Sequence, residues 1–166
     1  KTAALKFALS VYGDPVRLLC SYHTTAVGLE RSCATMMHLP LGLDELQVLA
    51  ERRLSIENIV YTLGGGIGKL RGAKAGGLQE TLHWRNIILS TGEMPLIREN
   101  SFDGVGSRVL ELCGRPVESE ETARTIHQVS ETHYGHAAKP FINYLINLDG
   151  NLRDLYSSIR DGLKER

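Results

Sequence analysis

The chain has 166 residues, of which 42% are hydrophobic and 23% charged, as is ordinary for a single soluble globular domain. The formal net charge is zero, which excludes nucleic-acid binding through overall charge and leaves only a local basic patch for that role. The three cysteines are scattered and odd in number, which argues against a disulfide framework or a zinc ribbon and predicts a reducing, cytoplasmic location.

The sequence indicates neither a membrane span nor a secretion signal. No apolar stretch approaches the roughly 20 residues that a membrane helix needs, and no signal-peptide pattern is present. The chain opens on Lys1-Thr2 without a methionine, so we expect it to be part of a longer protein.

Strands and helices are predicted to alternate from the N-terminus to residue 112. Residues 1–12 have apolar side chains at helical spacing and a stop at Gly13, which predicts an amphipathic helix. Two further helices are predicted to begin after capping residues, Thr24 or Thr25 for one and Ser55 for the other. The predicted strands are residues 16–22, the apolar run that ends at Asp44-Glu45, the run from Trp84 that ends at Ser90-Thr91, and residues 105–112.

The C-terminal part changes character and predicts three helices, at residues 119–133, 137–148 and 151–163. The whole pattern predicts an α/β fold: a three-layer P-loop NTPase core with a mostly parallel sheet, followed by a helical tail. We place the core in residues 1–116 and the helical subdomain in residues 117–166. Right-handed crossovers should bring the polar strand tips to one edge of the sheet.

Asp44 and Glu45 end the most apolar of the predicted strands. Adjacent carboxylates at the tip of a buried strand are costly unless a cation lies there, and a magnesium ion with a nucleotide would supply one. In P-loop NTPases the first acid holds the metal and the second can polarise the attacking water. The alternative is that the two acids cap the helix that follows.

Lys1-Thr2 stands at the start of the first predicted helix. These residues match the last two positions of the P-loop pattern G-x-x-x-x-G-K-[ST], whose glycine part is not in this sequence. Together with two strands that end in polar tips, the pair indicates a site for ATP and Mg²⁺. Gly68-Lys69 fails as a rival P-loop, because Leu63 occupies the first glycine position and Leu70 replaces the Ser or Thr.

The glycine-rich segment 64–77 carries Lys69, Arg71 and Lys74 and no acid. Glycines let the main chain approach a nucleic-acid backbone, and basic side chains neutralise its phosphates. The segment is therefore a candidate contact to DNA. The alternative is a mobile surface hairpin whose charges only aid solubility.

Three further features have both a functional and an ordinary interpretation. Ser90 or Thr91 is a candidate sensor of the terminal phosphate, or else an ordinary turn signal. Arg108 is a candidate arginine finger that serves a neighbouring subunit, or else a surface arginine at a strand start. His127, His133 and His136 meet no metal-ligand spacing on one helix face, so we interpret them as helix-end histidines.

Four blocks of sequence together resemble a known family: K-T-A-A-L-K-F-A-L-S-V-Y-G-D-P, L-D-E-L, N-I-V-Y-T-L-G-G-G-I-G-K-L-R and W-R-N-I-I-L-S-T-G-E. Their order and spacing over residues 1–112 are similar to the ATPase domain of phage- and plasmid-type primase–helicases. That domain, long catalogued as one of unknown function, occurs in replication proteins of bacterial mobile elements.

The resemblance implies a P-loop ATPase that acts as a ring helicase on DNA. Lys1 would then meet the β- and γ-phosphates, Thr2 and Asp44 would hold Mg²⁺, Glu45 would be the catalytic base, and Thr91 or Ser90 would be the sensor. The implied partners are single-stranded DNA and further copies of the chain, six in the full-length protein. The alternative function is a nucleic-acid-binding or assembly module of a replication protein that hydrolyses nothing.

Overall fold

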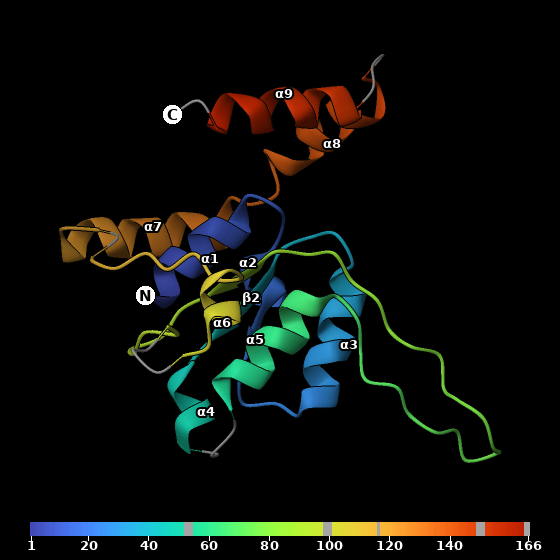
Figure 1. Cartoon of the computed structure of the whole chain (residues 1–166). Helices are drawn as coiled ribbons and strands as arrows, with labels where there is room; N and C mark the ends of the chain where they lie inside the picture. Colours follow the sequence, from blue (N-terminus) through green and yellow to red (C-terminus); the bar gives the residue numbers. More distant parts are fainter. Residues whose placement is uncertain (52–54, 98–100, 116, 149–151, 165–166) are drawn as a thin grey trace.

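The computed structural model describes residues 1–51, 55–97, 101–115, 117–148 and 152–164 (Figure 1). It is a mixed α/β fold, as predicted, with a small parallel sheet and helices around it. The helices are α1 (Thr2–Ser10), α2 (Pro15–Leu18), α3 (Ala26–Met36), α4 (Gln47–Glu51), α5 (Ile56–Gly65), α6 (Asp103–Gly106), α7 (Glu120–Thr132), α8 (Ala138–Ile146) and α9 (Leu152–Lys164). The strands are β1 (Leu19–Ser21), β2 (Leu41–Asp44) and β3 (Ile88–Ser90).

The sheet has the order β1-β2-β3, and both strand pairs are parallel. Ser21 of β1 lies opposite Asp44 of β2, and Leu43 of β2 lies opposite Ser90 of β3. The predicted meeting of the polar tips is therefore confirmed: Asp44 ends the central strand, and the tips of both neighbouring strands lie beside it.

The two faces of β2 meet different helices, because successive side chains of a strand point to opposite sides. Leu41 and Leu43 are fully buried in the core, which also contains residues of α3 and α5. Gly42 faces α1 instead, and a Cβ at this position would lie 2.4 Å from Leu9 Cδ1. The missing side chain at position 42 thus lets α1 lie close against β2, on the side to which Asp44 also points.

Local capping signals account for four of the helix starts, those of α2, α3, α5 and α7. Thr25 caps α3 and Ser55 caps α5, each accepting a hydrogen bond from a backbone N–H of the first turn. Asp14 caps α2 in the same way, with Pro15 at the first helical position. The predicted strand at 16–22 is therefore only partly right, because this cap starts a helical turn and β1 begins at Leu19.

The strand predicted at 105–112 is wrong. Residues 103–106 form α6, and no strand follows it among the described residues up to 115. Val105 is fully buried, whereas Leu110 and Leu112 are each 87% exposed. The apolar run therefore lacks the partner strand and the burial that would have ordered it as part of the sheet.

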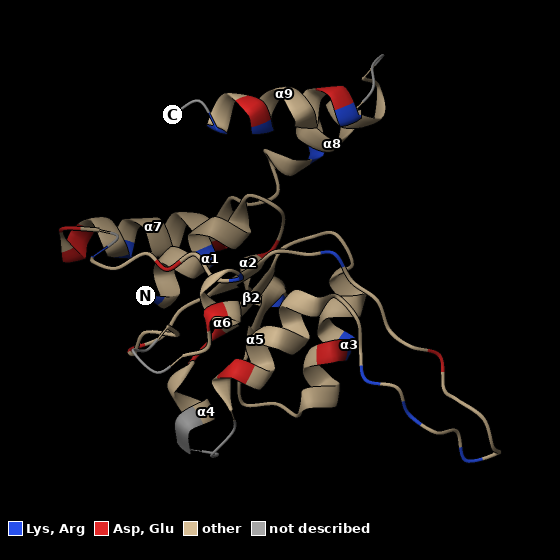
Figure 2. Ribbon diagram, viewed as in Figure 1, with Lys and Arg blue, Asp and Glu red and all other residues tan. Residues whose placement is uncertain are grey.

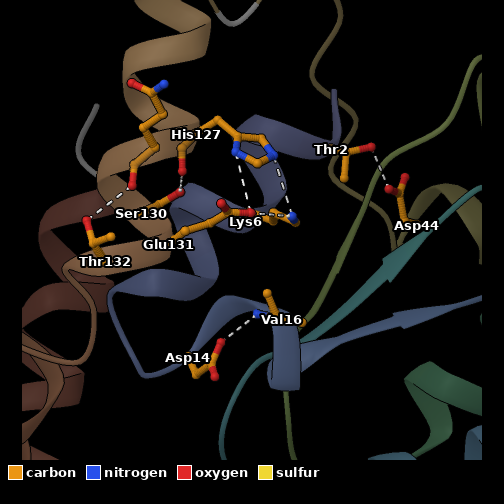
Figure 3. A network of polar contacts seen from close by, with 10 residues as sticks. Thr2, Lys6, Asp14, Val16, Asp44, His127, Ser130, Glu131 and Thr132 are labelled. Carbon is orange, nitrogen blue, oxygen red and sulfur yellow. Dashed lines mark hydrogen bonds and ion pairs between the residues drawn. The ribbon is translucent and has the colours of Figure 1, made fainter.

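The helical tail forms α7, α8 and α9 as predicted, and α7 packs along α1. Lys6 of α1 is largely buried between two side chains of α7: its Nζ lies 3.0 Å from Glu131 Oε1 and 3.5 Å from His127 Nε2 (Figure 3). Apolar residues recur at helical spacing along α9, at Leu152, Leu155, Tyr156, Ile159 and Leu163, but none of the residues described in this helix is buried. The predicted boundary after residue 116 falls outside the described residues.

None of the helices that the structure describes combines the length and the apolar character needed to cross a membrane.

Gly66 is predicted to be essential for the end of α5. Its φ of 69° is left-handed, and a Cβ there would lie 2.7 Å from the Trp84 backbone oxygen. Gly66→Ala should lower the free energy of unfolding by about 1–2 kcal/mol or more. Gly65→Ala is the matched control, since a Cβ there meets nothing within 4 Å and alanine favours the helix. Urea unfolding followed by circular dichroism tests the pair, and equal stabilities would contradict the prediction.

Candidate functional site

The carboxylate of Asp44 collects hydrogen bonds from three places in the chain. Thr2 Oγ1, at the start of α1, donates to Oδ2 over 2.6 Å. Thr91 Oγ1, just beyond β3, donates to Oδ1 over 2.6 Å, and the backbone N–H of Glu45 donates to the same oxygen over 2.8 Å. Figure 3 shows the side chain of Thr2 turned toward Asp44 at the tip of β2. Two of the residues predicted for one site are thus brought to the same carboxylate.

These hydrogen bonds set the charge state of Asp44. Partial burial raises the pKa of its carboxyl, but the hydrogen bonds from Thr2, from Thr91 and from the Glu45 backbone outweigh burial and hold the pKa below its ordinary value of 3.8. Asp44 is therefore a carboxylate at neutral pH, with both oxygens directed at polar groups. That is the form in which it can bind a cation.

Glu45 has an unusual backbone. Its φ of 65° lies in the left-handed region, which few residues other than glycine adopt. Its side chain turns toward β1, where Ser21 Oγ donates to Oε2 over 2.8 Å. Non-glycine residues with a left-handed backbone cluster at functional sites. There the unusual backbone directs the side chain to a position that a regular backbone would not allow.

An open pocket of about 300 Å³ lies beside these residues. Its walls come from the start of α1, the tip of β2, the start of α4 and the segment after β3, and consist of Lys1, Thr2, Asp44, Glu45, Gln47, Gly92 and Glu93. Lys1 is the basic residue of this set, and its Nζ lies 3.9 Å from Glu93 Oε1. Both of these side chains are mostly exposed.

The oxygen-rich lining suits Mg²⁺. Carboxylate and hydroxyl oxygens are ligands that this ion accepts, and it commonly keeps several waters and binds phosphate oxygens besides one or two carboxylates. Among the described residues, no group of three or more His, Cys, Asp or Glu can hold a metal ion by itself. Asp44 and Thr2 therefore fit an ion that completes its shell with water and phosphate, and the Lys1 ammonium suits the phosphate.

The structure separates the two residues that the sequence left as alternatives at the tip of β3. Thr91 contacts Asp44, whereas Ser90 Oγ lies 3.0 Å from the hydroxyl of Tyr22, which is buried. Burial raises the pKa of that phenol, so Tyr22 stays neutral. Of these two residues, Thr91 is therefore the one whose hydroxyl contacts Asp44, which lines the pocket.

Arg108 lies away from the pocket. Its guanidinium stacks 5.1 Å from the centre of the Tyr61 ring, and Nη1 donates to the Gly104 carbonyl over 2.7 Å. A role as an arginine finger toward a second subunit stays a prediction.

The glycine-rich segment belongs to a long hairpin-like arm, defined here as residues 67–83, that reaches away from the body of the fold (Figure 1). Antiparallel backbone contacts join Ile67 to His83 and Gly72 to Leu78. Most of the charged positions on the arm are basic (Figure 2). Lys69 and Lys74 are exposed there, as a nucleic-acid contact requires.

Arg71 differs from the other two basic residues of the arm. It forms two hydrogen bonds to Glu30 of α3, of 2.7 Å and 2.9 Å, and the Glu30 side chain is fully buried. The hydrogen bond from Arg71 holds the pKa of Glu30 below its ordinary value. Arg71 therefore compensates a buried charge and fixes the base of the arm, so it is not freely available to a ligand.

Sequence reasoning missed three residues near the carboxylates. Ser21 could have been predicted from the sequence, because it ends the strand that pairs with the strand of Asp44, and the tips of parallel strands lie at one edge of the sheet. Gln47 and Glu93 lie in loops or at a helix start, and only the folded chain brings them to the pocket.

Asp44 should make stability depend on pH. Its pKa is lower in the folded than in the unfolded chain, so its contribution is present above about pH 4 and is lost as the pH falls through the folded pKa. Urea unfolding between about pH 6 and pH 3 measures the free energy of unfolding of the wild type and of Asp44→Asn. The difference between these two free energies should become smaller as the pH falls. Asp154→Asn, at an exposed position of α9, should follow the wild type throughout. A constant gap for Asp44→Asn would contradict the prediction.

Residues 1–83 match the family described as Domain of unknown function (DUF927), which is half of the 166-residue chain. The matched segment contains the pocket residues of α1 and β2 and the whole arm, and it ends before β3. No curated protein and no solved structure matches the chain. Because the match extends over half of its length, the chain belongs to the DUF927 family.

Proposed function

We propose that this chain is the ATPase core of a ring-type DNA helicase that acts in the replication of a mobile element. One observation carries the proposal: the Thr2 hydroxyl and the Asp44 carboxylate, 42 positions apart in the sequence, meet at 2.6 Å at the carboxyl edge of a parallel sheet. A hydroxyl from a helix start and an acid from a neighbouring strand tip are the pair that holds magnesium in P-loop NTPases. The three-layer P-loop architecture is part of this proposal.

The proposal assigns a role in ATP hydrolysis to four pocket residues, Lys1, Thr2, Asp44 and Glu45, and to Thr91 beside them. Lys1 faces the β- and γ-phosphates, and Thr2 and Asp44 hold the metal ion. When bound, Mg²⁺ neutralises charge that develops on the phosphate oxygens. Glu45 orients the attacking water and takes up its proton. Thr91, which donates a hydrogen bond to the same carboxylate as Thr2, has the role of sensing the terminal phosphate in this proposal.

The arm supplies the contact to single-stranded DNA in this proposal. Lys69 and Lys74 are exposed on it, and backbone phosphates are the natural partners of such lysines. Arg71 belongs to the anchor of the arm, because its loss would leave the buried Glu30 carboxylate without its charged partner. The proposal also includes assembly into a ring, in which Arg108 serves the site of a neighbouring copy.

Glu45→Gln tests the chemistry in the full-length protein. The substitution keeps the shape of the side chain and removes the charge that accepts the proton, so kcat for ATP hydrolysis should fall by about 100-fold or more. Binding of Mg²⁺·ATP should stay within about twofold of the wild type, since Glu45 acts on water rather than on the nucleotide. Steady-state hydrolysis measures kcat, and titration calorimetry measures the affinity for Mg²⁺·ATP.

Glu121→Gln, an exposed acid of α7, is the matched control and should behave as the wild type. Unchanged turnover in Glu45→Gln would contradict the assigned role. Hydrolysis that is absent from the wild type, with DNA binding intact, would favour the alternative of a nucleic-acid-binding module that hydrolyses nothing.

The double variant Lys69→Ala/Lys74→Ala tests the arm. Each lost phosphate contact should reduce the slope of log affinity against log salt by about one, so the slope should fall by up to about two. The control is Lys139→Ala/Lys164→Ala, which removes the same charge from α8 and α9. Fluorescence anisotropy of a labelled single strand at several salt concentrations measures the slopes, and identical slopes for the arm variant and the wild type would exclude the arm as a DNA contact.

A further inference from the structure

The hydroxyl of Ser21 is held between two partners, one of which is the side chain of Glu45. Ser21 Oγ donates to Glu45 Oε2 over 2.8 Å, and the same Oγ accepts the backbone N–H of His23 over 3.0 Å. A serine hydroxyl has a single proton, and here that proton is directed at the carboxylate. The hydrogen bond from His23 restricts rotation of the hydroxyl, so the donor points at Glu45 before any ligand arrives.

The sheet fixes the position of Ser21 itself. Ser21 lies opposite Asp44 in the parallel pairing of β1 with β2, and the next residue, Tyr22, donates its backbone N–H to the Asp44 carbonyl oxygen over 3.1 Å. The Tyr22 side chain is buried, with 3% of its surface exposed. Groups built on such regular, packed elements hold a geometry more closely than groups on loops. Ser21 is therefore a fixed point beside the acid pair.

Glu45 is a side chain that needs such a fixed point. It is exposed and lines the pocket, and an exposed glutamate samples many rotamers that carry its carboxylate to different places. The left-handed backbone, with its φ of 65°, determines where the side chain of Glu45 begins. The hydrogen bond from Ser21 determines where its carboxylate ends. The two constraints together restrict the carboxylate at both ends of the side chain.

We infer that Ser21 is a positioning residue that holds the Glu45 carboxylate in place for the attacking water, and this inference rests on the function proposed above. In the step, the water oxygen forms a bond to the terminal phosphorus, the bond from that phosphorus to the bridging oxygen of the leaving ADP breaks, and Glu45 takes the proton of the water. A carboxylate can keep a hydrogen bond at Oε2 and take up a proton at Oε1. Ser21 thus exchanges no atom and acts only through the orientation of the base.

Three substitutions of Ser21 in the full-length protein test the inference. Ser21→Ala removes the hydroxyl, so kcat for ATP hydrolysis should fall by about 10-fold while KM for Mg²⁺·ATP stays within about twofold. Ser21→Thr retains the hydroxyl and should keep kcat within about threefold of the wild type. Ser21→Val has the shape of the threonine variant without its hydroxyl and suits a strand equally well, so it should show the loss of kcat that Ser21→Ala shows. Ser158→Ala, at an exposed position of α9, is the matched control and should leave kcat and KM unchanged.

A double-mutant cycle shows whether Ser21 acts through Glu45. In the background of Glu45→Gln the base is already absent, so adding Ser21→Ala should lower kcat by less than about twofold further. Single-turnover hydrolysis measures the slow variants. The same 10-fold loss in both backgrounds would mean that Ser21 acts on the fold rather than on the base, and would overturn the inference.

The outcomes separate this inference from the proposed function. If Glu45→Gln loses kcat while Ser21→Ala and Ser21→Val hydrolyse ATP as fast as the wild type or faster, the role of Ser21 alone is overturned. Equal kcat in Ser21→Thr and Ser21→Val would also overturn it, because the hydroxyl would then be irrelevant. A wild type without hydrolysis would overturn the proposed function and the inference together.

Discussion

The carboxylate of Asp44 joins parts of the chain that are distant in sequence. It accepts hydrogen bonds from the start of α1 and from the residue after β3, and it ends the central strand itself. A partly buried charge at this place is stable only with such donors, so α1 must lie against β2. Gly42 permits that approach, and α7 lies along α1 through the contacts of Lys6. The position of α7 thus follows, step by step, from one acid.

A fully buried carboxylate organises the opposite part of the fold in the same way. Glu30 is fully buried on α3, and Arg71 reaches it from the arm with two hydrogen bonds. Removing one member of such a pair is far more costly than the pair is favourable, because it leaves a buried charge alone. The base of the arm is therefore fixed to α3. The Lys69 side chain is exposed at this base, and that of Lys74 is exposed farther out along the arm.

The features that the sequence predicts well are those specified by neighbouring residues. The caps at Thr25 and Ser55 and the apolar run of β2 each carry their own local signal. Residues 105–112 show the limit, because an apolar run becomes a strand only beside a partner strand, and none of the described residues buries Leu110. The pairing of Arg71 with Glu30 joins positions 41 apart, and no local pattern marks it. Which of Ser90 and Thr91 contacts Asp44 depends on the face of the sheet to which each side chain points, and only the folded structure shows this.

The left-handed backbone at Glu45 restricts which residues can occupy this position as the family diverges. Glycine adopts that conformation freely and asparagine or aspartate at low cost, whereas glutamate there costs on the order of 1 kcal/mol. Glycine or asparagine at position 45 would therefore relieve the strain of the turn. Under the proposed function, a family member with either residue here would keep the turn and lack the carboxylate that acts on the water.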